Sequence, residues 1–313
     1  MTISAFKKHF KTELSGLYTE SESSFLSSLF VQKIVGFDSF HQRRFSDQEL
    51  LITDEKQLAD LISELKTGRP YQQILGETEF YGMKFFVDEN VLIPRPETEE
   101  LLEMAILEIK EYISRAMYRH LKSKGLDYRW SEEARYDSAD NDKEKVPKTL
   151  KILDIGTGSG IIPLVLKKHF PDAVVSSIDY SEKALETARR NAAYHQLEIQ
   201  FIHTDYLHFD LPERYDIIIS NPPYIGIEEE VDIADSVKEF EPKMALFSPT
   251  SDALIFYRKI AEDSKKYLKD HGLLFLEINQ KLGPETLELY QHFSNAELLK
   301  DLSGNDRFIY GRK

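Results

Sequence analysis

The sequence lacks cysteine altogether, and its 40 Lys and Arg residues are outnumbered by 54 Asp and Glu residues. Without cysteine the chain can form no disulfide and can use no thiolate as a nucleophile or metal ligand. The net charge of −14 argues against broad binding to a phosphate backbone, which requires clustered Lys and Arg. An acidic protein is better suited to a basic protein partner.

Long apolar runs are missing as well, since no stretch approaches the roughly 18 residues of a membrane span. The amino terminus does not pair a basic start with an apolar core, as a secretion signal would. The nine histidines are scattered without the spacing of metal ligands. We therefore expect a cytoplasmic protein that binds neither a membrane nor a metal ion, and we expect it to be a monomer.

Helical patterns fill the first part of the chain. Apolar residues recur at three- and four-residue spacing through residues 1–67 and predict a bundle of three to five helices. Asp54 and Gln57 resemble a helix-capping pair at the start of the last of these helices. Gly68 resembles the cap at its end.

A chain of 313 residues can hold a catalytic domain of about 200 residues and a smaller second domain. We predict a helical bundle over residues 1–75, a β-hairpin linker over 76–93, and an α/β catalytic domain over 94–313. Residues 119–149 form the most polar stretch of the chain. We interpret them as a solvated surface insert rather than a partner-binding segment.

Short apolar runs predict the strands of a mostly parallel sheet. The first four runs cover residues 150–155, 173–178, 199–203 and 215–220. A helix over 252–268 and a fifth strand over 272–278 follow, and 296–302 with 307–312 predicts a final antiparallel hairpin. In open α/β sheets ligands bind at the carboxyl ends of the strands, so the residues that follow these runs are the candidate site.

A glycine-rich turn follows the first strand and precedes a helical pattern. It consists of Gly156, Thr157, Gly158, Ser159 and Gly160. Glycines let the backbone turn tightly and let a ligand approach its N–H groups, while the helix N-terminus favours a carboxylate or phosphate. Ile161 stands where the nicotinamide-cofactor fingerprint needs a third glycine, which argues against a dinucleotide site.

The second and third strands end in acidic residues. Asp179 lies about one βαβ step past the glycines, the spacing at which an acid reaches both hydroxyls of an adenosine ribose. A lone strand-terminal Asp is more often a helix cap, and here Ser181 is the expected cap of a helix over 182–194. Asp205 and Tyr206 follow the third strand and place an acid and an aromatic ring where an adenine would lie.

The fourth strand is followed by the most informative residues of the chain, Asn221, Pro222, Pro223 and Tyr224. Two prolines stop the sheet ladder and stiffen the backbone. The Asn221 side-chain oxygen and the Pro222 carbonyl can each accept one N–H of a planar NH2 group, while Tyr224 covers its flat face. This arrangement suits methylation of an amino or amide nitrogen; the alternative is an ordinary proline-rich loop.

In this order the four strand ends resemble those of the Rossmann-like S-adenosylmethionine-dependent methyltransferases, over residues 94–313. A more restrictive match lies upstream. It comprises residues 69–76, 79–82 and 91–99, and the last of these stretches reads Val-Leu-Ile-Pro-Arg-Pro-Glu-Thr-Glu. These motifs extend the resemblance to nearly the whole chain. With them the chain resembles the HemK/PrmC family, the peptide chain release factor N5-glutamine methyltransferases.

The resemblance implies a class I methyltransferase fold, S-adenosylmethionine as methyl donor and S-adenosylhomocysteine as product. It implies class I release factors as substrates, methylated on the glutamine of a Gly-Gly-Gln motif, with the 1–75 bundle contributing to their recognition. The donor would be bound by residues 156–160, Asp179, Tyr206 and Asn221, and the amide by residues 221–224. Arg95 and Glu97 either line the same cleft or pair with each other to pin the loop, and we favour the ion pair.

Two alternatives stay open. The loop at residues 221–224 suits an adenine amino group equally well, which would make the chain a nucleic-acid adenine-N6 methyltransferase. Such an enzyme must flip a base and usually carries a basic recognition region, which this acidic chain does not offer. The second alternative, a binding module that keeps the fold without catalysis, is disfavoured by the intact glycines, acid and proline loop.

Overall fold

The computed structural model describes residues 1–123, 149–226, 229 and 235–313. The chain divides into two compact units, one formed by Met1–Thr78 with Ile233–Phe240 and the other by Glu79–Asp232 with Glu241–Lys313. The predicted insert over residues 119–149 lies largely outside the described residues, apart from the end of one helix. Our predicted domain limits and the role of each domain stay predictions.

The smaller unit is helical. Its elements are α1 (Ile3–Glu13), α2 (Glu20–Val35), α3 (Ser39–Arg44), α4 (Ile52–Lys66), α5 (Tyr71–Leu75) and α9 (Asp235–Phe240). Apolar stripes of α1, α2 and α4 form its core, where Phe10 and Phe30 are fully buried with ring centroids 5.9 Å apart. At 25 cal/mol per Å², burying side chains of this size contributes roughly 2 kcal/mol each.

Helix caps in this unit differ in part from the prediction. The capping pair Asp54 and Gln57 is wrong, because α4 begins at Ile52 without a side-chain cap and Asp54 lies inside its first turn. A capping box does begin α2, where Thr19 and Glu22 bond to each other's backbone N–H groups. The C-cap of α4 is Thr67, and the next residue, Gly68, has a φ of +87°, a conformation that favours glycine.

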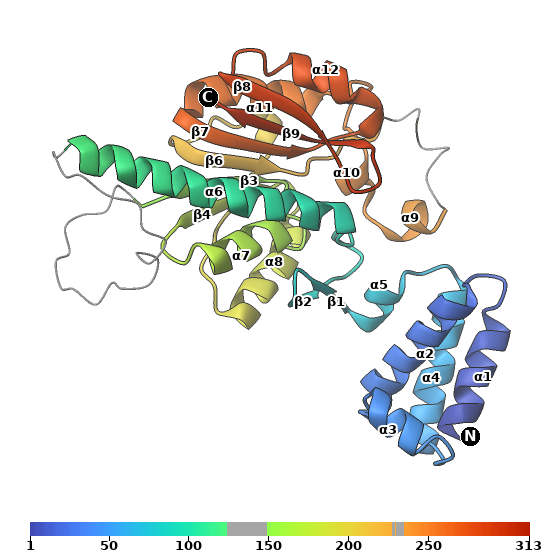
Figure 1. The fold of residues 1–313 in the computed structure, drawn as a ribbon. Coiled ribbons are helices and arrows are strands. Elements are labelled where there is room, and N and C mark those ends of the chain that lie inside the picture. Colours follow the sequence, from blue (N-terminus) through green and yellow to red (C-terminus); the bar gives the residue numbers. More distant parts are fainter. Residues whose placement is uncertain (124–148, 227–228, 230–234) are drawn as a thin grey trace. The chain divides into compact units, whose positions relative to one another are not determined.

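The larger unit is built on a seven-stranded sheet (Figure 1). Its strands are β3 (Lys151–Ile155), β4 (Val174–Asp179), β5 (Gln200–His203), β6 (Tyr215–Ser220), β7 (Leu268–Glu277), β8 (Asn295–Lys300) and β9 (Asp306–Arg312). The spatial order is β5-β4-β3-β6-β7-β9-β8. Strands β3 to β7 pair in parallel, whereas β9 is antiparallel to both β7 and β8. The mostly parallel sheet with a final antiparallel hairpin is confirmed.

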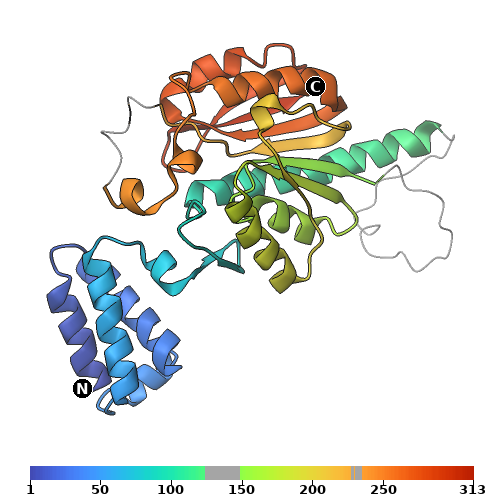
Figure 2. The same cartoon turned by 180° about the vertical axis from the view of Figure 1, so that it is seen from behind.

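Helices cover both faces of this sheet, because alternate strand residues point to opposite faces. The helices are α6 (Pro96–Ser123), α7 (Ile161–His169), α8 (Glu182–His195), α10 (Lys243–Leu246), α11 (Ile255–Tyr267) and α12 (Gly283–Glu288). Ile217 and Ile219 pack with α6 and α7 on one face, and Ile218 packs with α11 on the other. Figures 1 and 2 show these two helical layers from opposite sides.

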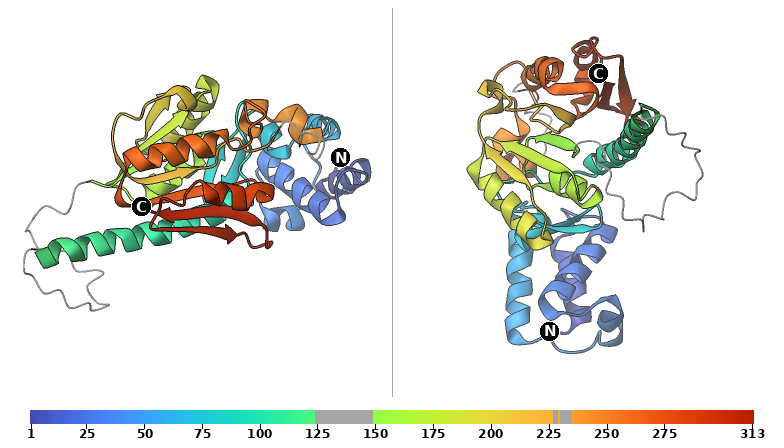
Figure 3. Two further views of the ribbon diagram at one scale, coloured as in Figure 1. Left: turned by 90° about the horizontal axis from the view of Figure 1, so that it is seen from above. Right: turned by 90° about the vertical axis from the view of Figure 1, so that its left-hand side faces the viewer.

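Two further features frame the site. Strands β1 (Glu77–Phe80) and β2 (Met83–Phe86) form a hairpin whose turn residues Tyr81 and Gly82 both have positive φ. Helix α6 continues to Ser123, past the ends of the strands (Figure 3). Within the described residues, no helix combines the length and apolar character needed to cross a membrane.

Candidate active site

A cavity of about 720 Å³ opens at the carboxyl ends of β3, β4 and β6 in the larger unit. The order of the strands reverses at β3, since β4 follows it on one side and β6 on the other. In doubly wound sheets this switch point is where the connecting loops diverge and leave room for a ligand. The cavity therefore lies where the topology alone places a binding site.

The glycine turn after β3 forms one wall of the cavity through Gly156, Thr157, Gly158 and Ser159. Gly156 and Gly158 have φ of +88° and +52°, and an added Cβ at Gly156 would lie 3.4 Å from the Asn221 carbonyl oxygen. The turn thus passes close to the backbone of the loop after β6, and its positive φ angles favour glycine.

Gly160 has a different environment from the other two glycines. It is absent from the residues that line the cavity, and its φ is +85°. A Cβ added there would lie 3.2 Å from both the Ala188 Cβ of α8 and the Leu164 Cδ1 of α7. Its geometry is that of a packing glycine between two helices, and its predicted role in donor binding stays a prediction.

A buried amide and a buried acid support the glycine turn from below. Asn191 of α8 is fully buried and donates to the Ser159 and Phe86 carbonyls at 2.8 and 2.9 Å. Ser177 donates to the Asp154 carboxyl at 2.5 Å and lies 2.6 Å from the Thr157 hydroxyl. Burial raises the pKa of Asp154 well above its usual range, and the Ser177 hydrogen bond opposes that effect.

Asp179 stands at the end of β4 and lines the cavity. Its two oxygens accept hydrogen bonds of 2.8 Å from the backbone N–H groups of Gly158 and Ser181. Burial raises the pKa of Asp179, and these two hydrogen bonds oppose that effect. The helix cap itself is Ser181, as predicted, because its hydroxyl accepts from the Ala184 N–H. Asp179 therefore bonds to the glycine turn and is not the N-cap of α8.

Asp205 and Tyr206 follow β5, and both line the cavity. Asp205 begins a short 3-10 turn by accepting from the Leu207 N–H at 3.0 Å. Tyr206 is 4% exposed, with the Lys259 ammonium 5.3 Å from its ring centroid. Burial and then the charge of Asp263 raise the pKa of Tyr206, so its phenol stays neutral. The pair offers an acid and a flat ring next to the third strand.

The loop after β6 forms another wall of the cavity through Asn221, Pro222 and Pro223. Tyr224 is not among the lining residues; it packs against the apolar cluster around Tyr257, and its carbonyl accepts from the Asn279 amide at 3.2 Å. Burial and then the nearby Glu277 raise the pKa of Tyr224. Its packing on a substrate amide stays a prediction.

Behind Asn221 lies a buried polar chain that the sequence did not reveal. The Asn221 amide nitrogen donates to the Thr98 hydroxyl at 3.2 Å, and Thr98 donates to the Glu277 carboxylate at 2.7 Å. Thr98 and Glu277 are 0% and 1% exposed. Burial raises the pKa of Glu277 to about 7, and the Thr98 hydrogen bond opposes that effect. The signal available in the sequence was an acid, Glu277, within the apolar run of residues 272–278.

Arg95 also lines the cavity, but its partner is not the one we favoured. It donates to the Glu241 carboxylate at 2.6 Å, and the other oxygen of Glu241 accepts from the Ile93 N–H at 3.0 Å. Glu241 is 4% exposed. The favoured ion pair with Glu97 is therefore wrong, although the inference that an ion pair pins this loop agrees with the contacts.

Comparison with known proteins assigns the family. Residues 142–239 match the family model described as "Methyltransferase small domain". A "Release factor glutamine methyltransferase" of Flavobacterium psychrophilum is 41% identical, and the alignment covers 99% of this chain and 98% of that protein. Proteins of the same name from Streptococcus pneumoniae and Bacteroides thetaiotaomicron are 37% and 32% identical, over 99% and 96% of this chain and 98% and 96% of theirs. With a class I methyltransferase sheet and this identity along its whole length, the chain belongs to the release factor glutamine methyltransferases.

Proposed function

We propose that this enzyme methylates the side-chain amide nitrogen of the glutamine in the Gly-Gly-Gln motif of class I peptide chain release factors, and so supports translation termination. The methyl donor is S-adenosylmethionine, which leaves as S-adenosylhomocysteine. The observation that carries the proposal is that Asn221 and Pro222, the predicted amide acceptors, line the same cavity as the glycine turn. No observation favours a nucleic acid substrate.

The residues present fit the donor. Gly158 lines the cavity and nothing lies within 4 Å of a Cβ built on it, so a ligand can approach the backbone closely there. The N–H groups at the start of α7 would hold the donor's carboxylate, Asp179 its ribose hydroxyls, and Asp205 with Tyr206 its adenine. When bound, the donor supplies an electrophilic methyl group on a sulfonium.

The chain's own task is to position a weak nucleophile. An amide nitrogen is weak because its lone pair is delocalised into the carbonyl. Asn221 Oδ1 and the Pro222 carbonyl would accept its two N–H groups, which raises electron density on nitrogen and fixes its direction of attack. One N–H proton becomes acidic as the N–C bond forms and leaves to solvent, so no strong base is required.

The partner and cellular setting belong to the same proposal. The net charge of −14 suits a basic protein partner. We propose that the helical bundle, residues 1–75, contributes to recognition of the release factor and that the enzyme acts as a cytoplasmic monomer. Deleting the bundle would then raise the KM for the release factor while leaving donor affinity unchanged.

The test is transfer of a tritiated methyl group from the donor to purified release factor, with double-stranded and single-stranded DNA as parallel substrates. We expect label on the release factor alone, in the proteolytic peptide that contains Gly-Gly-Gln. A release factor whose motif glutamine is replaced by alanine should receive none. Label on DNA, or on a peptide outside the motif, would overturn the proposal.

A further inference from the structure

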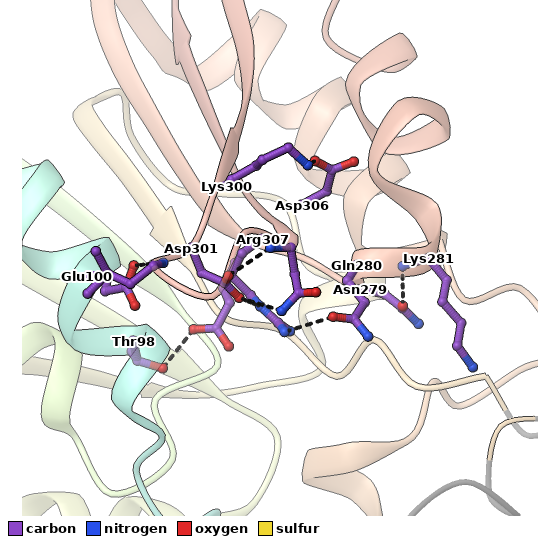
Figure 4. A network of polar contacts seen from close by, with 12 residues as sticks. Thr98, Glu100, Asn279, Gln280, Lys281, Lys300, Asp301, Asp306 and Arg307 are labelled. Carbon is purple, nitrogen blue, oxygen red and sulfur yellow. Dashed lines mark hydrogen bonds and ion pairs between the residues drawn. The ribbon is translucent and has the colours of Figure 1, made fainter.

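The polar chain behind Asn221 carries information beyond burial. Thr98 lies in the first turn of α6, and Figure 4 shows it facing a carboxylate at the end of the sheet, which is Glu277 of β7. Asn221 and Thr98 both line the cavity, whereas Glu277 is absent from its lining and lies buried behind them. Each of the two hydrogen bonds runs inward, from donor to acceptor, toward Glu277.

The direction of these bonds follows from proton counting. A threonine hydroxyl has one proton, and an ionised carboxylate can only accept. Because Thr98 gives its proton to Glu277, its oxygen can only accept from Asn221. The group of Asn221 that faces Thr98 must then be the NH2, so the hydrogen bonds themselves decide which end of the amide is nitrogen and which is oxygen. Oδ1 lies on the other branch of the planar amide.

We infer that Glu277, together with Thr98, is a positioning residue that fixes the Asn221 amide with its oxygen free for the substrate. Asn221 interacts with Glu277 both through Thr98 and by a direct side-chain hydrogen bond. This inference rests on the proposed function, since the substrate amide offers N–H donors. Without an ionised acceptor at Glu277, the Thr98 proton can turn toward Asn221 and stabilise the flipped amide. The flipped amide presents NH2 to the substrate NH2, so donor meets donor and the nucleophile is misplaced.

Other charged and titratable groups face Glu277 from several elements. Arg307 of β9 and Glu97 of α6 act on it with opposite sign, and Tyr224 and Tyr257 are its phenolic neighbours. Arg307 is itself held by Asp301 at 3.2 Å and by Gln280 at 3.3 Å (Figure 4). Burial raises the pKa of Glu277 to about 7, so its ionised fraction changes near neutral pH.

The first test compares Thr98→Val, which keeps the shape but removes the hydroxyl, with Thr98→Ser, which keeps the hydroxyl. We expect Thr98→Val to lower kcat roughly tenfold to hundredfold with little change in donor affinity or KM for the release factor. Thr98→Ser should restore most of this loss. Thr286→Val is the matched control, because Thr286 is a fully buried threonine of α12 that bonds only a helix carbonyl.

The second test uses pH. The wild-type kcat should rise with pH, with a midpoint at about pH 7, because ionised Glu277 is the acceptor that orients Thr98 and Asn221. Glu277→Gln and Thr98→Val should lose this rise and show a flat, lower kcat. If Thr98→Val does not fold, Glu277→Gln and Thr98→Ser still decide the matter. A kcat for Thr98→Val within twofold of wild type, or an unchanged rise with pH in both variants, would overturn the inference.

A third readout separates this inference from the proposed function. The side-chain NH2 resonances of Asn221, in protein labelled at asparagine, should shift with pH in the wild type and not in Thr98→Val. They report the amide directly and need no turnover. If the wild type is inactive on release factor but its resonances depend on pH, only the proposed substrate is refuted. If the wild type is active but its resonances respond neither to pH nor to Thr98→Val, only the positioning role of Glu277 and Thr98 is refuted.

Discussion

The two walls of the cavity are held in different ways. On the donor side, Gly158 and Asp179 are joined across 21 residues by a hydrogen bond to backbone N–H. On the acceptor side, Asn221 donates to Thr98, which lies 123 residues before it in the chain. Thr98 in turn donates to Glu277, which lies 179 residues after Thr98. The donor wall is thus held by backbone N–H groups that bond to Asp179 and by buried side chains of β4 and α8, and the acceptor wall by a chain of side chains from three separate elements.

This difference suggests a division of labour. In the proposed function, the donor's carboxylate is bound by backbone N–H groups, which a glycine turn at a helix N-terminus exposes. The acceptor side must orient one amide, so it uses side chains whose own orientation is fixed by further side chains. Changes on the acceptor wall should therefore affect kcat, and changes on the donor wall should affect donor affinity.

The largest effect is expected from Asn221→Ala. Loss of an acceptor that acts in the transition state should lower methyl transfer by roughly a hundredfold or more. Donor affinity, measured by calorimetry, should stay near that of wild type because the glycine turn is untouched. Near-normal turnover by the purified variant would contradict the division between the two walls.

Next in size is a change of stability in Glu277→Gln. Because folding raises the pKa of this carboxyl from 4.5 to about 7, the folded state favours the protonated form. The wild type therefore loses stability as pH rises through this window, and the variant does not. The melting temperature of Glu277→Gln relative to wild type should increase from pH 5 to pH 8, by the equivalent of about 2 kcal/mol. A constant difference across this range would contradict a raised pKa.

Asp179→Ala should act on the donor wall. Removing the carboxylate takes away the predicted partner of the donor's ribose and the acceptor of the Gly158 N–H. We expect donor affinity to fall about tenfold in calorimetry, with kcat at saturating donor changed much less. If kcat fell while affinity was retained, the two walls would not divide binding and catalysis as described.

The smallest effect concerns the packing glycine. Gly160→Ala must adopt a φ of +85° and approach Ala188, so it should destabilise the fold by more than about 1 kcal/mol. Gly304→Ala is the matched control, since its φ is +87° and nothing lies within 4 Å of the added Cβ. Equal unfolding free energies in urea for the two variants would show that helix packing adds nothing to the strain.

Much of the fold was predictable because its signals are local. The strand Tyr215–Ser220 and the cap Ser181 have the limits and contacts that apolar runs and capping rules predict. The capping pair at Asp54 failed because the N-cap of α4 is Leu51, three residues earlier, which offers no side-chain hydrogen bond. The roles of Glu241 and Glu277 as hydrogen-bond acceptors of site residues could not be predicted. The sequence around a glutamate does not show which distant side chain it will contact.

Helix α6 links the reaction site to the opposite edge of the sheet. Thr98 lies in its first turn and Ser123 at its end, so the helical rise separates them by roughly 40 Å. The chain returns at Lys151, where β3 begins, while the cavity lies at the other end of that strand. Both attachment points of the segment between residues 123 and 149 are therefore remote from the reacting amide. Labels or length changes introduced in that segment should leave methyl transfer intact, which makes it the place to attach a probe to the working enzyme.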